Sequence, residues 1–147
     1  MKIVVLKFGG TSVGSINRIK KVADIISRNT KNKKKVIVVS SAMSGVTNEL
    51  IRKTRQISNN FDPSEYDVLV SSGEQMSCAL ISGRLNHIGI KSRSWLSWQV
   101  PIFTEGDYKK SRIVNIFKKR ILKYLNSGGV PIISGFQGIN HQTRLTT

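Results

Sequence analysis

The chain has 147 residues, of which 39% are hydrophobic, and 24 lysines and arginines outnumber 8 aspartates and glutamates to give a formal net charge of +16 at pH 7. The length predicts a single domain with one core, and the hydrophobic content excludes a compositionally disordered chain. A membrane span needs roughly 20 apolar residues in a row, whereas the longest apolar runs, such as residues 3–6, have four.

Residues 2–7 predict a buried strand, because a short β-branched apolar run is followed by Gly9 and Gly10. The apolar stretch stops at Lys7 without a small-residue cleavage site, which argues against a signal peptide. Residues 7–14, KFGGTSVG, put glycines where backbone N–H groups can approach a phosphate, and Lys7 would face the oxygens of a transferring phosphoryl group. The lysine precedes the glycines, unlike in a Walker A loop. An ordinary strand-to-helix turn with an exposed lysine remains the alternative.

A helix is expected over residues 15–29, with Ser15 as its N-cap and apolar side chains at helical spacing. These side chains belong to Ile19, Val22, Ala23 and Ile26.

A second buried strand is expected over residues 35–41, and a loop over residues 42–46 leads into a helix over residues 47–58. The small residues of the loop leave room for a ligand, and the hydroxyls of Ser41 and Thr47 can hydrogen-bond a small polar molecule. In the alternative interpretation these hydroxyls satisfy N–H groups at the start of the helix.

Asp62 begins the next helix as an N-cap, with Pro63 at the first helical position and Glu65 at the capping-box position. We expect this helix to be interrupted at residues 71–73 and a new helix to run over residues 74–87.

Glu74 would then lie at a helix start, where the helix dipole favours a carboxylate. Ser72 and Gln75 fit a capping box at the same place, which needs no ligand. The functional interpretation is that the Glu74 carboxylate accepts hydrogen bonds from a substrate ammonium group.

Cys78 is the only cysteine, so an internal disulfide is excluded and a reducing, cytoplasmic compartment is the simplest inference. Its apolar neighbours indicate a small core residue. His87 and His141 are isolated, and no His, Cys or carboxylate spacing suggests a metal site.

The remaining elements complete an alternating pattern. We expect strands over residues 90–96 and 130–134, a small β excursion over residues 100–104 and 109–113, a helix over residues 114–126, and glycine stops at Gly89, Gly128 and Gly129. Phe136, in the turn at residues 135–138, either walls a pocket or covers the core. Alternating strands and helices favour a parallel sheet covered on both faces, which binds ligands at the carboxyl ends of its strands.

Two basic clusters account for part of the charge: Lys31 with residues 33–35, and residues 118–120. Such clusters can bind nucleic acid, but neither has interleaved aromatic residues on which bases could stack. Nucleic-acid binding is therefore disfavoured.

The four loop segments, in this order, resemble the aspartate kinase family of the amino-acid kinase superfamily. The resemblance covers essentially the whole chain and rests on residues 7–13 (KFGGTSV), residues 41–48, Gly73 with Glu74, and residues 135–138 (GFQG). It implies a three-layer α/β/α fold around a mainly parallel sheet. It also implies transfer of phosphate from ATP to the side-chain carboxylate of L-aspartate, the first step toward lysine, threonine and methionine.

The resemblance further implies individual roles. Lys7, Phe8, Gly9 and Gly10 would contact the nucleotide phosphates, with Lys7 stabilising the transition state; Ser41, Thr47, Glu74 and Phe136 would bind aspartate, with Glu74 taking the α-ammonium. Mg²⁺ would accompany ATP, held mainly by the phosphates rather than by a protein metal site.

Family members continue into a Gly-rich motif with an arginine and an aspartate, and this chain stops at Thr147, about where that motif begins. We therefore expect residues 1–147 to be the N-terminal part of a truncated amino-acid kinase domain, without the later nucleotide-binding half and the regulatory domains. Three alternatives stay open: another amino-acid or nucleoside monophosphate kinase, a non-catalytic remnant, and a half that pairs with a separate partner chain or forms a homo-oligomer.

Overall fold

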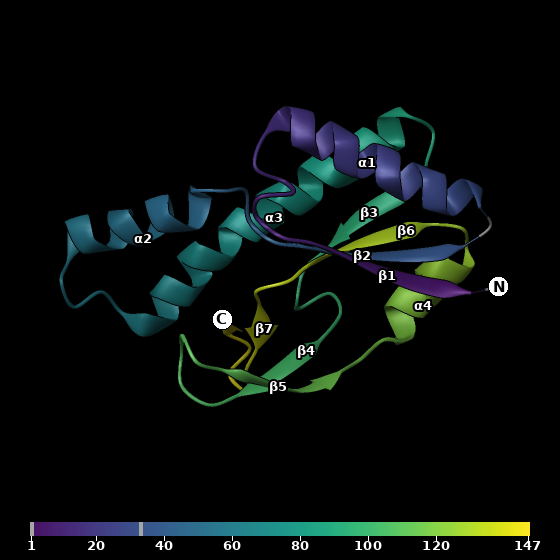
Figure 1. Cartoon of the computed structure of the whole chain (residues 1–147). Coiled ribbons are helices and arrows are strands. Elements are labelled where there is room, and N and C mark those ends of the chain that lie inside the picture. The colour runs from purple at the N-terminus through teal and green to yellow at the C-terminus, as the bar shows by residue number, and fades with distance from the viewer. Residues whose placement is uncertain (1, 33) are drawn as a thin grey trace.

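The computed structural model describes residues 2–32 and 34–147. Its main sheet has four parallel strands. In sheet order these are β1 (Ile3–Phe8), β2 (Lys35–Ser40), β6 (Val130–Ser134) and β3 (Ser92–Trp95). Helices α1 (Ile16–Lys31) and α3 (Pro63–His87) cover one face and α4 (Lys119–Asn126) lies on the other (Figure 1). This arrangement confirms the predicted α/β/α layers around a mainly parallel sheet.

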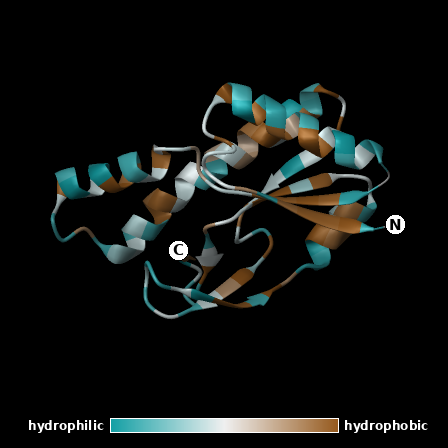
Figure 2. Cartoon of the chain, viewed as in Figure 1, coloured by the Kyte–Doolittle hydropathy of each residue, from teal (hydrophilic) through white to brown (hydrophobic). Residues whose placement is uncertain are grey.

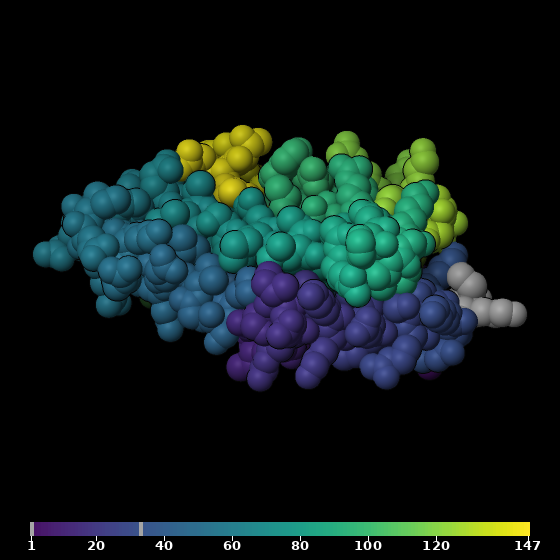
Figure 3. Space-filling model, turned by 90° about the horizontal axis from the view of Figure 1, so that it is seen from above, coloured from purple at the N-terminus to yellow at the C-terminus, as the bar shows by residue number. Residues whose placement is uncertain are grey.

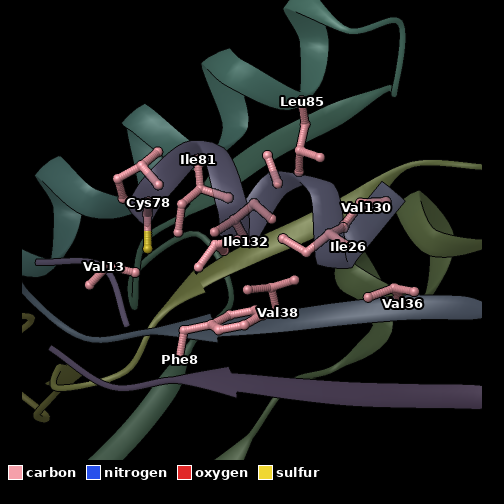
Figure 4. Packing of buried hydrophobic residues seen from close by; sticks show 13 residues of the cluster. Phe8, Val13, Ile26, Val36, Val38, Cys78, Ile81, Leu85, Val130 and Ile132 are labelled. Atoms are coloured by element: carbon pink, nitrogen blue, oxygen red, sulfur yellow. The ribbon is translucent and has the colours of Figure 1, made fainter. Parts of the chain in front are cut away.

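The core lies mainly between the sheet and the first helical layer. Ile26 of α1 and Ile81 and Leu85 of α3 pack over Val38 and Ile132 of the strands (Figure 4). In Figure 2 the central strands are brown while the outer sides of α1 and α2 (Val46–Ile57) are mostly teal. The apolar periodicity of α1 explains how this helix packs on the sheet, whereas the buried side of α3 also carries polar residues.

The predicted start of α1 is confirmed. The Ser15 hydroxyl accepts a hydrogen bond from the Arg18 N–H at 3.3 Å, so it satisfies one of the free donors of the first turn. The four apolar positions expected to face the core are all buried: Ile19, Val22, Ala23 and Ile26.

The predicted interruption at residues 71–73 is wrong, because α3 is one continuous helix of 25 residues. The Asp62 cap is confirmed, with its carboxylate accepting from the N–H groups of Ser64 and Glu65. Ser72 does not cap a new helix, because its hydroxyl donates to the Leu69 carbonyl at 2.6 Å. Gly73 serves packing instead: a Cβ there would lie 3.1 Å from Val46 Cγ1.

A second, smaller sheet lies on the α4 side. Its order is β5 (Arg112–Ile116), β4 (Ile102–Glu105), β7 (Gly138–Ile139) and β8 (Leu145–Thr146). The predicted β excursion is confirmed, but the helix expected from residue 114 begins only at Lys119, because residues 112–116 pair antiparallel with β4. Strands β7 and β8 were not expected, since two-residue strands carry no periodic signal.

Asp67 of α3 holds the second sheet against this helix by hydrogen bonds. Its buried carboxylate accepts from the Lys109 N–H at 3.1 Å, the Thr147 N–H at 2.9 Å and the Thr147 hydroxyl at 2.6 Å. The yellow C-terminal segment accordingly lies against the teal α3 in Figure 3. Among the helices described, none combines the length and the apolar character needed to cross a membrane.

Candidate functional site

Strands β1, β2 and β6 end level with one another. In the sheet register Phe8 pairs with Ser40, and Ser40 pairs with Ser134. Beyond these pairs, the Ser41 N–H donates to the Phe8 carbonyl and the Gly135 N–H donates to the Ser40 carbonyl, each at 3.0 Å. The three loops that the sequence singled out are therefore joined at the carboxyl edge of the sheet, where α/β proteins bind ligands.

The first loop begins at Lys7, an exposed residue near the end of β1. Gly9 accepts hydrogen bonds from the Ser12 and Val13 N–H groups at 2.9 and 3.3 Å, and the buried Val13 anchors the turn. A Cβ at Gly10 would lie 3.1 Å from the Ala42 carbonyl oxygen, so this close approach of the first and second loops depends on glycine.

The space in front of this loop is open. A Cβ at Gly9 would meet no heavy atom within 4 Å. The Phe8 side chain instead belongs to the core under α1, so only its backbone can face a ligand. A lysine beside open glycine backbone is suited to holding an anion such as a phosphate.

Glu74 reaches the same edge from the middle of α3. Its side chain is buried, and Oε2 accepts a hydrogen bond from the Phe136 N–H. The expected place at a helix start is therefore wrong, and the helix dipole does not explain this carboxylate.

Burial raises the pKa of Glu74. The backbone N–H groups of Phe136, Ala42 and Gly135 and the positive charge of Lys7 act in the opposite direction, which places all of them around this carboxyl. A buried carboxylate approached by donors from two loops can bind a cationic group, whose charge would offset the desolvation.

Ser41 and Thr47 line the second loop and are both partly buried. The N-cap of α2 is Gly45, with φ of 83°, and it has no side-chain capping bond. The interpretation of the Ser41 and Thr47 hydroxyls as caps is therefore wrong. Both remain candidates for contact with a small polar ligand.

Phe136 was expected either to wall a pocket or to cover the core. Its side chain is 47% exposed, so it does not cover the core. Its N–H holds Glu74 while its ring stays free at the edge of the site.

Sequence reasoning missed Ser77. Its buried hydroxyl donates to the Ser41 carbonyl at 2.7 Å and lies 3.3 Å from the Ser40 hydroxyl. It therefore ties α3, one turn after Glu74, to the end of β2. The available signal was its position one helical turn after Glu74, on the same side of α3.

Cys78 lies directly beneath the site. Burial raises the pKa of its thiol to about 11, and the Ser134 hydroxyl approaches its sulfur at 3.5 Å. Since the thiolate is the reactive form, Cys78 is an inert core residue, as expected.

Residues 2–32 and 34–147 contain no group of three or more His, Cys, Asp or Glu side chains that could hold a metal ion. His141 lies in the turn between β7 and β8, with Nε2 at 3.6 Å from the Glu105 carboxylate. His87 is an exposed residue at the end of α3.

Known proteins share both the sequence and the fold. Residues 2–147 match the profile of the amino acid kinase family. An aspartokinase of Rickettsia felis is 45% identical over 150 residues, covering 100% of this chain and 37% of that protein. The chain thus spans little more than a third of the length of this curated relative.

Two solved structures superpose closely. The aspartate kinase from Synechocystis gives a TM-score of 0.81 with 34% identity, covering 99% of this chain and 23% of that one. E. coli aspartokinase III in complex with aspartate and ADP gives a TM-score of 0.82 with 22% identity. This match covers 100% of this chain and 43% of that chain. At that identity the second likeness shows the fold alone.

Proposed function

The chain belongs to the amino acid kinase family, and we propose that its loop cluster at the ends of β1, β2 and β6 is the phosphate- and aspartate-binding part of an aspartate kinase. In this reaction a side-chain carboxylate oxygen of L-aspartate attacks the γ-phosphorus of ATP. The bond from that phosphorus to the β,γ-bridging oxygen breaks, and ADP leaves. The product, 4-phospho-L-aspartate, is an acyl phosphate that would begin the route to lysine, threonine and methionine.

The observation that carries this proposal is the meeting of one cation and one buried carboxylate at the same sheet edge. Lys7 lies near the end of β1, Glu74 comes from α3, and the charge of Lys7 is among the influences on the Glu74 pKa. An amino-acid kinase needs both features, because it must bind phosphate oxygens and an α-ammonium group close together.

On the phosphate side, Lys7 would stabilise the negative charge of the transferring phosphoryl group. The backbone of Phe8, Gly9 and Gly10 would approach the phosphates, since nothing lies within 4 Å of a Cβ position at Gly9. Mg²⁺, which is a hard ion and keeps oxygen ligands, would be held mainly by the phosphates of ATP. This assignment fits a site with a lysine and backbone donors and without a carboxylate cluster in its described residues.

On the aspartate side, Glu74 would accept hydrogen bonds from the α-ammonium group. The hydroxyls of Ser41 and Thr47 would bind the polar groups of the substrate, and the exposed ring of Phe136 would close the pocket. The cationic ligand would favour the ionised form of Glu74, whose charge burial otherwise opposes.

We further propose that residues 1–147 correspond to the N-terminal part of the kinase domain of longer relatives and that the chain by itself turns over negligibly. Phosphoryl transfer depends on positioning and charge neutralisation, and the chain spans only 37% of the Rickettsia felis relative. The test is to incubate the chain with ATP, Mg²⁺, L-aspartate and hydroxylamine, which traps the acyl phosphate as a hydroxamate. Robust hydroxamate formation would contradict the inactivity.

The residue roles can be tested in a fusion of this chain to the C-terminal part of the Rickettsia felis enzyme. Lys7→Ala should lower kcat by about 100-fold or more, because it removes a donor to transition-state charge. Glu74→Ala should raise the KM for aspartate by roughly tenfold or more. Lys53→Ala, on the exposed side of α2 and paired only with Glu49, is the matched control and should leave both constants unchanged. Wild-type kinetics in both test variants would disprove the assignments.

A second candidate function is a half-domain that associates with another polypeptide. β1 is an edge strand of the described sheet, and its outer face leaves Ile3 46% and Val5 62% exposed. Unpaired edges and exposed apolar side chains favour association. Mixing the chain with a separately produced C-terminal part of the relative, and measuring hydroxamate formation, distinguishes this function: activity restored in trans supports it.

A further inference from the structure

A second hollow lies on the opposite face of the sheet from the Glu74 cluster. It has a volume of about 510 Å³, within the range of small-molecule pockets. We name it the tryptophan pocket, and the residues that matter to its chemistry are Arg93, Trp95, Trp98, Arg120, Lys123 and Tyr124.

The elements that build the pocket explain its composition. Arg93 and Trp95 are two residues apart on β3, so both side chains point to the face that α4 covers. On α4, Arg120, Lys123 and Tyr124 have helical spacing of three and four residues and share one side. The pocket is thus the gap between an edge strand and the helix beside it, widened by the turn that carries Trp98.

Aromatic rings form the wall. Trp95 and Tyr124 meet edge to face, with ring centroids 5.6 Å apart, and the Arg93 guanidinium lies 4.4 Å from the Trp95 ring. Trp98 is 56% exposed, an unusual position for so large an apolar surface. A planar ring of a ligand that entered the hollow would cover part of the exposed Trp98 surface.

Uncompensated positive charge forms the rim. The ion pairs among the described residues are Lys53–Glu49, His141–Glu105 and Arg144–Glu65, so no carboxylate pairs with Arg93, Arg120 or Lys123. From residue 88 to the end, the sequence contains only two acidic residues, Glu105 and Asp107. Such a local excess attracts anions, and arginine in particular recognises carboxylate and phosphate.

We propose that the tryptophan pocket binds a small anion that carries an aromatic or heteroaromatic ring. The ring stacks against the exposed Trp98, and the carboxylate or phosphate accepts hydrogen bonds from Arg120 and Lys123. A nucleic-acid strand is a poorer fit, because the three rings gather in one hollow rather than along a track. This site is separate from the Glu74 cluster, because α4 and α3 lie on opposite faces of the sheet (Figure 1).

The chain provides its own reporter for this proposal. It has two tryptophans, Trp95 and Trp98, and both line the pocket. Intrinsic tryptophan fluorescence of the full chain therefore reports on this site alone. The probes are adenosine monophosphate and phenylacetate, which represent the two sources of a ring joined to an anion.

We expect a saturable change in emission with at least one of these probes. Adenosine without phosphate, and inorganic phosphate without a ring, should each bind about tenfold more weakly or worse. The double variant Arg120→Ala/Lys123→Ala should weaken binding of the probe by about tenfold or more. Both residues are exposed, so the variant should still fold. Lys53→Ala is the control and should bind as the wild type does.

Lys7→Ala should also keep the full response, which separates this site from the proposed phosphate site. The proposal is overturned if neither probe gives a saturable change at millimolar concentration, or if the double variant binds as tightly as the wild type. It is likewise overturned if a single-stranded oligonucleotide binds through Arg120 and Lys123 more tightly than either probe does, because the site would then be a nucleic-acid surface.

Discussion

The main parallel sheet and the smaller second sheet are stabilised in different ways. The parallel sheet is covered by apolar helix faces, and fully buried side chains such as Ile26, Ile81 and Ile132 fill the space between. The second sheet leaves Ile113 and Val114 largely exposed and is held to α3 by hydrogen bonds. The first region therefore depends on shape and burial at many positions, whereas the second depends on a smaller apolar cluster around Ile102 and on the polar contacts of Asp67.

The largest effect should follow from a cavity in the first region. Ile132→Ala removes a fully buried side chain beneath α1 and α3 and should lower the free energy of unfolding by about 2–5 kcal/mol. Urea unfolding of the wild type and the variant, monitored by circular dichroism, measures this difference in the free energy of unfolding. Ile113→Ala in β5, at 57% exposure, is the matched control and should change stability by less than about 0.5 kcal/mol. Equal losses in the two variants would remove the distinction between the regions.

Next in size is the loss of the Asp67 anchor. Asp67→Asn replaces one accepting oxygen by an N–H₂ group that faces donors from Lys109 and Thr147. Hydrogen bonds to a charged group contribute roughly 1.5–3 kcal/mol each, so the second sheet should loosen. Hydrogen exchange should accelerate at the amides of β4 and β7 while those of β2 stay protected. Uniform acceleration would show that the two sheets unfold as one unit.

A smaller, pH-dependent effect is expected at Glu74, whose pKa in the folded chain is raised above the ordinary value of 4.5 by burial. Below that value the carboxyl is protonated in both states. As the pH rises, the unfolded chain releases its proton first, so wild-type stability falls until the folded carboxyl also ionises. Glu74→Gln does not titrate there. The difference in unfolding free energy, wild type minus variant, should therefore decrease from about pH 4.5 upward and then level off. A difference that rises with pH would mean that the donors and Lys7 outweigh burial.

The smallest effect concerns α3, which both regions share. Ser72 is exposed in the middle of this helix. Ser72→Ala should raise stability by about 0.5 kcal/mol or less, because alanine has the higher helix propensity. A helix that began at residue 73 would lose its cap and be destabilised instead. Thermal melting of the wild type and the Ser72→Ala variant shows whether stability rises or falls.

Much of the first region followed from the sequence because its signals are local. Ser15, the Asp62 cap and the apolar spacing of α1 act over a few residues, and all were found where expected. The break at residues 71–73 failed for a tertiary reason. Gly73 looked like a stop, but it lets the loop before α2 approach α3 closely.

The candidate site shows the same difference between features set by neighbouring residues and features set by distant ones. Lys7 and the glycine loop could be proposed as a phosphate site from sequence alone because these residues are contiguous in the chain. The environment of Glu74 was not, since its partners come from loops more than 30 residues before it and about 60 after it. The tryptophan pocket was missed for the same reason: Trp95 and Trp98 lie at least 20 residues before the basic cluster at residues 118–120, yet Arg120 lies beside both in the fold.

The sequence by itself determined the main alternation of strands and helices, the loops that we propose to bind substrates, and the family. Only the tertiary structure decided that α3 is continuous, that Glu74 is buried against Phe136, and that the aromatic and basic residues share one hollow. The physical reason is that propensity, capping and periodicity are short-range, whereas desolvation and charge interactions depend on distances in space that the fold alone establishes.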